Sequence, residues 1–167
     1  MKKGYINSGL IIIMITAVLS ACSVSKEARK MNRNINGDWV LETMITDGET
    51  GNIKNKIFNE ADFSCFIGSE WNFTPKNNMG SYAIIDKQKN CPVIKRLFSW
   101  TFSEARDVPS VFLLTRLDDK NNPVDKEARF SFTITQLDKK QMKLKADIVF
   151  EGRPATIIYN FEKRKTK

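Results

Sequence analysis

The chain of 167 residues contains no histidine. This absence excludes Ser-His-Asp and Cys-His nucleophile systems, zinc sites with histidine ligands, and a histidine pH switch. Glycine and proline are sparse, at eight and five residues, so the chain is neither collagen-like nor a low-complexity linker. With 41% hydrophobic and 28% charged residues, the composition fits one globular domain and excludes a polytopic membrane protein.

The apolar run at residues 10–19 is too short to cross a bilayer. It has ten residues, whereas a membrane-spanning helix needs about 20. The run follows Lys2 and Lys3 and precedes the tetrapeptide Leu19-Ser20-Ala21-Cys22. A basic start, a short apolar core and small residues are typical of a signal peptide for export.

The tetrapeptide ending at Cys22 resembles the bacterial lipobox. The resemblance implies that residues 1–21 are a signal peptide, that the Cys22 sulfur takes a diacylglycerol, and that the new amine is acylated. Because two or more acyl chains hold a protein stably on a bilayer, we expect a membrane-anchored lipoprotein of the bacterial cell envelope. Ser23, without an acidic neighbour, resembles the pattern for the outer membrane. The alternative is an ordinary secretory signal with a chance cysteine.

Two further cysteines, Cys65 and Cys91, remain in the exported chain. An even pair in an oxidising compartment predicts a disulfide, with two free thiols as the alternative. Residues 22–34 are polar and basic and predict a flexible tether, followed by one domain over residues 35–167.

From Gly37 onward the apolar residues recur mainly with a period of two, which predicts β-strands. Eight stripes of alternating apolar residues are present: Trp39, Leu41 and Ile45; Trp71 and Phe73; Tyr82 and Ile84; Phe98, Trp100 and Phe102; Val111, Leu113 and Leu117; Phe130, Phe132 and Ile134; Met142, Leu144, Ala146, Ile148 and Phe150; Ile157, Tyr159 and Phe161. The mixed pattern of residues 57–67 predicts one short helix.

One-sided alternation is typical of antiparallel strands, since parallel strands are apolar on both faces. The short connections between the later strands predict a meander. Eight such strands hide their apolar faces either by closing into a barrel or by splitting into two packed sheets, and closure also removes exposed edges. The sequence therefore predicts an all-β fold, an eight-stranded antiparallel up-and-down barrel.

The sequence Gly37-Asp38-Trp39, at the start of the first strand, resembles the lipocalin signature Gly-x-Trp. The whole domain is similar to lipocalin-like lipoproteins of Gram-negative bacteria, through residues 37–41, 69–73, 78–82 and 157–163 together with the two cysteines. The resemblance implies a lipocalin-like barrel in which Trp39 packs across the closed end. For the late arginine that covers this tryptophan in lipocalins, Arg153 and Arg164 are the candidates.

Such a barrel either binds one small molecule or is filled by side chains. Nine aromatic residues are the candidate ligand-binding set: Trp71, Phe73, Tyr82, Phe98, Trp100, Phe102, Phe130, Phe132 and Tyr159. If they line a cavity, we expect a small lipophilic ligand. If they fill the core, we expect a non-catalytic module that binds an envelope protein or inhibits a target through its loops.

No nucleophile motif is present, so we expect neither an enzyme nor a cofactor. The net charge of +8 fits nucleic acid, but export argues against that partner. Residues 118–127 contain several oxygen donors, but their spacing is not that of an EF-hand, and Lys120 and Lys126 dilute the charge. We therefore expect a solvated loop and no metal.

Overall fold

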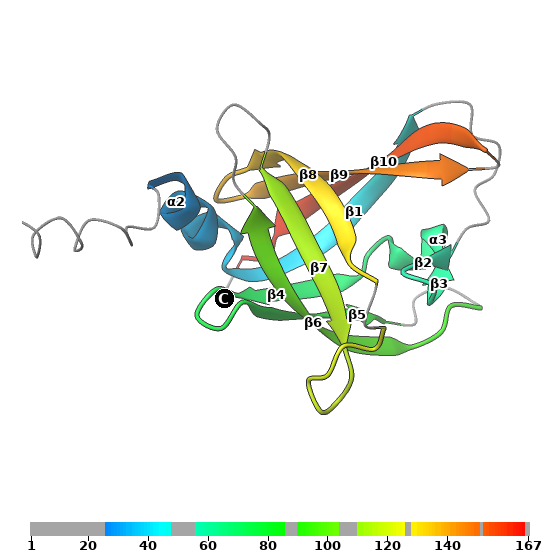
Figure 1. The fold of residues 1–167 in the computed structure, drawn as a ribbon, viewed down its shortest axis with the longest axis horizontal. Coiled ribbons are helices and arrows are strands. Elements are labelled where there is room, and N and C mark those ends of the chain that lie inside the picture. Colours follow the sequence, from blue (N-terminus) through cyan, green and yellow to red (C-terminus); the bar gives the residue numbers. More distant parts are fainter. Residues whose placement is uncertain are drawn as a thin grey trace, which may run out of the picture.

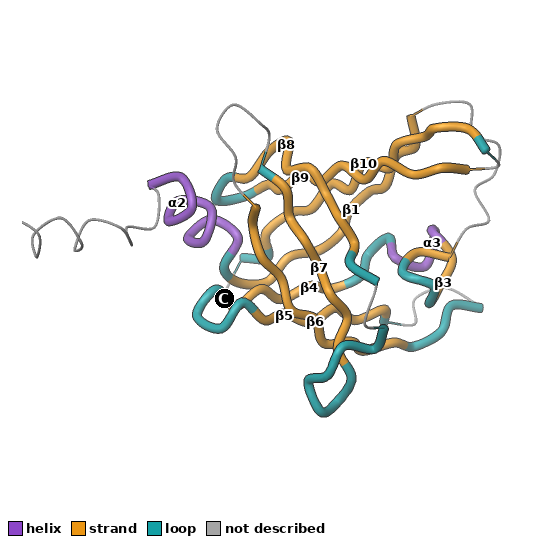
Figure 2. Tube along the Cα trace, viewed as in Figure 1, coloured by secondary structure: helices purple, strands orange, loops and turns teal. Residues whose placement is uncertain are grey.

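A computed structural model describes residues 26–47, 56–85, 90–103, 110–125, 128–150 and 152–165. Eight antiparallel strands form a closed barrel in the order β1-β10-β9-β8-β7-β6-β5-β4 (Figures 1 and 2). The strands are β1 (Gly37–Asp47), β4 (Glu70–Thr74), β5 (Met79–Ile84), β6 (Ile94–Ser103), β7 (Val111–Leu117), β8 (Phe130–Leu137), β9 (Gln141–Phe150) and β10 (Arg153–Lys163). This confirms the predicted all-β class and the eight-stranded barrel.

The barrel closes where β1 pairs with both β10 and β4. Trp39 lies opposite Lys163 on one side and opposite Trp71 on the other. From β4 to β10, each strand pairs with the next one along the chain. This is the up-and-down topology of lipocalin-like barrels.

Large aromatic side chains fill much of the barrel. Trp39, Tyr82, Phe73, Phe98 and Phe112 are each no more than 1% exposed. They belong to one continuous buried cluster. Because a well-packed interior leaves few voids, this part of the barrel is a core and not a channel.

In two strands, the residues that face the core differ from those predicted. In β1 the pairing with β10 shifts between Leu41 and Thr43, so Met44 is buried and Ile45 is 53% exposed. A β-bulge adds one residue to a strand and thereby reverses the facing of the residues beyond it. In β7 the buried residues include Phe112 and Leu114, whereas the predicted Val111 and Leu113 are only half-buried.

The segment expected to form one short helix contains a hairpin as well. β2 (Lys56–Ile57) pairs with β3 (Ala61–Asp62), and the four-residue helix α3 (Phe63–Phe66) comes directly after β3. Cys65 of α3 forms a disulfide with Cys91, as predicted, with an S–S distance of 2.05 Å. These elements lie at one end of the barrel, which we call the mouth (Figure 1).

The described part of the expected flexible tether is helical. Helix α2 (Lys26–Ile35) has Glu27 in its first turn and Arg33 in its last turn, which suits the helix dipole. Its last turn is fixed to the barrel, because Ile35 is 1% exposed and the Asn34 side-chain amide donates to the carbonyl oxygen of Leu137 at 3.1 Å. Within the described residues, no helix is long and apolar enough to cross a membrane.

Helix α2 covers the closed end of the barrel, opposite the mouth (Figure 1). There the Trp39 indole N–H donates to the carbonyl oxygen of Ile35 at 2.7 Å. The side chain that covers Trp39 belongs to Lys163, whose Nζ lies 5.0 Å from the ring centroid and donates to the carbonyl oxygen of Asn34 at 2.9 Å. Burial lowers the pKa of Lys163.

Neither arginine proposed for that position occupies it. Lys163 shares the inward facing of Tyr159 and Phe161, at a spacing of two residues in β10. Gly37, the first residue of the Gly-x-Trp motif, has a φ of +110°, which favours glycine. A Cβ there would also lie 3.3 Å from Cε of Lys163.

Candidate ligand-binding site

The structure places all nine predicted aromatic residues on the inner face of the barrel. Seven are buried, and Phe102 and Phe130 are half-buried. The rings near the closed end pack on one another, with centroid distances of 5.4 Å from Phe73 to Phe98 and 5.2 Å from Trp100 to Phe102. This part of the predicted set belongs to the core.

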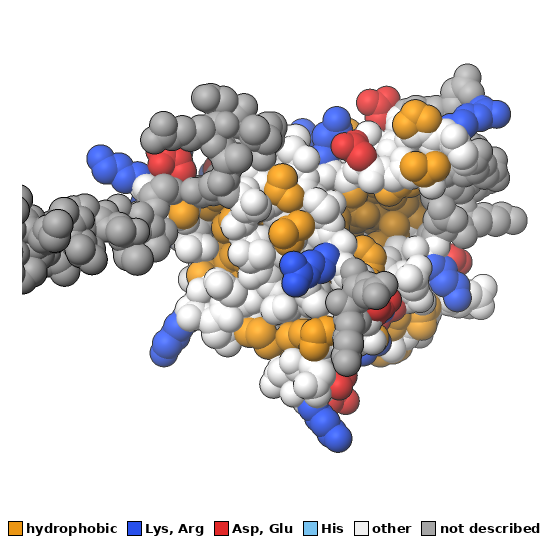
Figure 3. Space-filling model, viewed as in Figure 1, with side chains coloured by type: hydrophobic (Ala, Val, Ile, Leu, Met, Phe, Trp, Pro, Cys, Tyr) orange, Lys and Arg blue, Asp and Glu red, His pale blue; other side chains and the backbone are white. Residues whose placement is uncertain are grey.

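A cavity of 480 Å³ lies at the mouth, between the β2–β3 hairpin and strands β8, β9 and β10. Phe130, Phe132 and Tyr159 of the predicted set line it, together with Ile57 and Ile157. Apolar side chains line a recess beside β8 in the space-filling view (Figure 3). Six of the nine predicted residues do not line this cavity.

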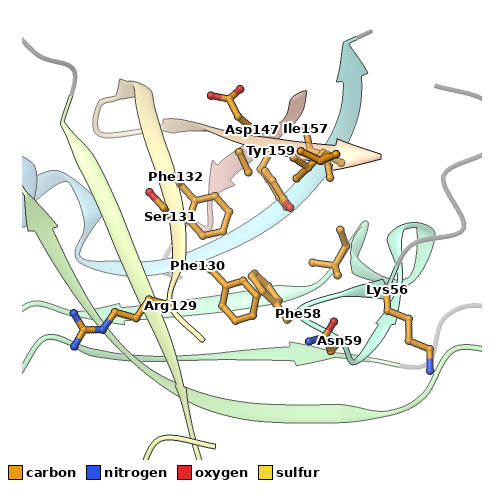
Figure 4. A pocket seen from close by; sticks show the side chains of 14 residues that line it. Lys56, Phe58, Asn59, Arg129, Phe130, Ser131, Phe132, Asp147, Ile157 and Tyr159 are labelled. Carbon is orange, nitrogen blue, oxygen red and sulfur yellow. The ribbon is translucent and has the colours of Figure 1, made fainter. Parts of the chain in front are cut away.

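The walls of the cavity are apolar and its charged side chains lie at the rim. The rings of Phe132 and Tyr159 pack edge to face against each other in the wall, with centroids 5.4 Å apart, whereas Lys56, Arg129 and Asp147 point away from the centre of the cavity (Figure 4). Burial raises the pKa of Tyr159 above its ordinary value. An apolar cavity with a few polar groups suits a small lipophilic molecule.

Phe58 closes the inner side of the cavity and was not predicted from the sequence. It is 5% exposed, and its ring centroid lies 4.7 Å from that of Phe130 and 5.6 Å from that of Tyr82. Phe58 and Asn59 both have positive φ, of 53° and 59°, in the turn between β2 and β3. This conformation is uncommon for a phenylalanine and directs its ring into the mouth.

Behind Phe58 lies a buried ionic cluster that was not predicted from the sequence either. Its centre is Glu60, whose side chain is only 6% exposed. The carboxylate accepts hydrogen bonds from Arg96 Nε at 2.6 Å, from Arg116 Nη1 at 3.1 Å, and from the Tyr82 hydroxyl. Tyr82, Arg96 and Arg116 come from the neighbouring strands β5, β6 and β7. The cluster joins the hairpin to the barrel wall.

The cluster has more positive than negative charge. Two guanidinium groups face the single carboxylate of Glu60. The Arg116 side chain is 9% exposed, lies over the Phe130 ring at 5.6 Å, and its Nε makes no hydrogen bond to any described residue. Burial and the hydrogen bond to Glu60 raise the pKa of Tyr82, so Tyr82 adds no negative charge.

The loop with several oxygen donors forms a turn. The Asp118 carboxylate accepts hydrogen bonds from the backbone amides of Lys120 and Asn122, both at 2.8 Å. These bonds lower the pKa of Asp118. Among the described residues, no group of three acidic or cysteine side chains is arranged to hold a metal ion.

Comparisons with known proteins give structural similarity only. No protein-family model matches the chain, and no curated protein sequence matches it. Among solved structures, the chain is similar to the odorant-binding protein from bovine nasal mucosa, with 11% identity over 87% of this chain and 79% of that chain, and a TM-score of 0.43. It is also similar to the bovine odorant-binding protein in complex with a selenium-containing odorant, with 13% identity over 87% and 80% of the chains and a TM-score of 0.43.

Proposed function

We propose that this protein binds a small lipophilic molecule at the mouth of its barrel. The observation that carries the proposal is the 480 Å³ cavity, because its walls include Phe130, Phe132, Tyr159 and Ile157. A cavity of this volume lies within the range of small-molecule sites. The ligand site is therefore smaller than the full aromatic interior and excludes the filled closed end.

A fluorescent dye tests this proposal. N-phenyl-1-naphthylamine is neutral and emits strongly in apolar surroundings, so its fluorescence should rise and saturate on addition of the full-length protein. Ala146 lines the cavity and is 9% exposed, so Ala146→Leu should fill part of it and weaken dye binding. Ala83→Leu, at a half-buried position of β5 that does not line this cavity, is the matched control and should leave dye binding unchanged. An equal loss of dye binding in both variants would refute the placement of the ligand site in this cavity.

We further propose that the protein is an envelope lipoprotein anchored through Cys22. This residue lies outside the described part of the chain, and the support is the signal-like segment and the lipobox resemblance. Mass spectrometry of the membrane fraction should find a diacylglycerol on Cys22 and no peptide from residues 1–21. Cys22→Ser should release the protein from the membrane. A soluble wild-type protein would contradict the anchor.

A second candidate function is binding of an envelope protein by the outer surface. It is favoured by the exposed apolar side chains of Ile45 in β1 and Val149 in β9, which are 53% and 74% exposed. Strands β1 and β9 pair with β10 on its two sides, so the two residues lie in the same three-stranded part of the barrel. If a partner binds there, Val149→Lys should abolish its co-purification and leave dye binding unchanged.

A further inference from the structure

The β2–β3 hairpin places an aromatic ring and a carboxylate, two residues apart, in the mouth of the barrel. The ring of Phe58 packs against Phe130, and the carboxylate of Glu60 binds Arg96 and Arg116. Among the described strands, β2 and β3 pair only with each other, so side-chain contacts hold the hairpin against the barrel wall. Beside the cavity, the hairpin therefore presents an apolar group and a carboxylate to the barrel wall, the same two groups that an amphiphilic ligand with a carboxylate would present.

The attachment of this hairpin is asymmetric. On one side, α3 continues directly from β3 and is fixed by the disulfide from Cys65 to Cys91, just before β6. On the other side, Ile57 and Phe58 border the 480 Å³ cavity along β8, β9 and β10. Among the described residues, the disulfide therefore fixes the hairpin on one side only, and its other side borders the cavity.

The charges behind the hairpin favour an anion. A buried charge is costly unless it is paired and hydrogen-bonded. Arg116 shares one carboxylate with Arg96, and its Nε makes no hydrogen bond to a described residue. A guanidinium binds a carboxylate best through two parallel hydrogen bonds, so a carboxylate ligand would satisfy Arg116 more fully than Glu60 does.

We propose that the mouth of the barrel binds an amphiphile with a single carboxylate, which replaces Glu60 on Arg116 and Arg96. Its apolar chain extends along Phe130 into the cavity, and the Phe58 ring gives way to it. The inference rests on the proposed function, because it names the class of ligand for the same cavity.

Competition against the neutral dye tests the inference. Dodecanoate and 1-dodecanol have the same chain length, and only dodecanoate is charged at pH 7.5. Both would be titrated into the full-length protein loaded with N-phenyl-1-naphthylamine, below the concentrations at which they aggregate. We expect dodecanoate to displace the dye at about tenfold lower concentration than dodecanol, which corresponds to about 1.4 kcal/mol.

Two variants isolate the role of the charges. Glu60→Gln removes the competing carboxylate and should increase the preference for dodecanoate over dodecanol by a further factor of about ten. Hydrogen bonds to charged groups contribute enough free energy to account for such a factor. Arg116→Gln should abolish the preference. Glu70→Gln, in the partly exposed ion pair with Arg164, is the matched control and should leave the preference unchanged.

The outcomes separate this inference from the proposed function. Equal displacement by dodecanoate and dodecanol in the wild-type protein would overturn the inference and leave the proposed function intact. Absence of dye binding and of displacement by either compound would overturn both. If Glu60→Gln does not fold, the comparison of the two compounds in the wild-type protein and in Arg116→Gln still decides the matter.

Discussion

At position 58, replacement of the phenylalanine by glycine should give a more stable protein than replacement by alanine, which is the reverse of the usual order. Loss of a buried phenylalanine ring costs about 3 to 5 kcal/mol, and we expect the lower value because the hairpin can shift into the space. Phe58 has a φ of 53°, and the left-handed conformation costs a residue with a Cβ roughly 1 to 2 kcal/mol. Glycine avoids this cost but loses roughly 0.5 to 1 kcal/mol through its greater freedom in the unfolded chain. Phe58→Gly should therefore be more stable than Phe58→Ala by about 0.5 to 1 kcal/mol.

Urea unfolding followed by tryptophan fluorescence measures both variants. Phe66 provides the matched control, because it is fully buried but lies in the helix α3. There glycine should be the less stable replacement by about 1 kcal/mol. The same order at both positions, with alanine more stable, would refute the assignment of strain to Phe58. Both Phe58 variants should also bind the dye more tightly than the wild-type protein, since loss of the ring enlarges the cavity.

Four further predictions concern the barrel and its closure. Gly80→Ala should cost at least 1 to 3 kcal/mol, because its Cβ would lie 2.4 Å from the Phe98 ring, and an unchanged melting temperature would refute this packing. Lys163→Gln should cost about 2 kcal/mol through loss of its contacts at the closed end, whereas Lys163→Arg should retain most of the stability in the same thermal assay. Reduction of the disulfide should lower the free energy of unfolding by about 3 kcal/mol, measured by urea titration with and without reductant. Hydrogen bonds from a neighbouring side chain and two backbone amides lower the pKa of Asp138. The ionised Asp138 therefore stabilises the folded state fully at a pH above its unfolded-state pKa of about 4, and this contribution is lost as the pH falls below that value. Asp138→Asn should flatten this part of the stability–pH curve.

The period of two was sufficient to predict the barrel strands that have one apolar face. In β9 and β10, for example, Met142, Leu144, Tyr159 and Phe161 are buried as predicted. It failed in β7, whose residues 111–114 are all apolar, so that either facing fits the pattern. In β1 it failed after the bulge, because a one-residue shift in pairing leaves no trace in the alternation itself.

The candidate site was less predictable than the fold. Arg116 comes after Phe112 and Leu114 at intervals of two residues, but a charged residue in a strand normally faces water, so its burial was not expected. Phe58 and Glu60 lie in a segment without clear periodicity, and the contacts that place them in the mouth are long-range: Phe58 with Phe130, and Glu60 with Arg96 and Arg116. For Lys163 a usable signal existed, since it continues the inward stripe of Tyr159 and Phe161.

The position of α2 at the closed end has a consequence for orientation in the envelope. With a lipid on Cys22, only three residues separate the anchor from the first residue of α2, a reach of at most about 14 Å. The closed end would then face the bilayer, and the opening would point into the aqueous compartment (Figure 1). Cargo could not diffuse sideways from the lipid leaflet into the barrel, so it would have to leave the membrane first or be handed over by a soluble donor.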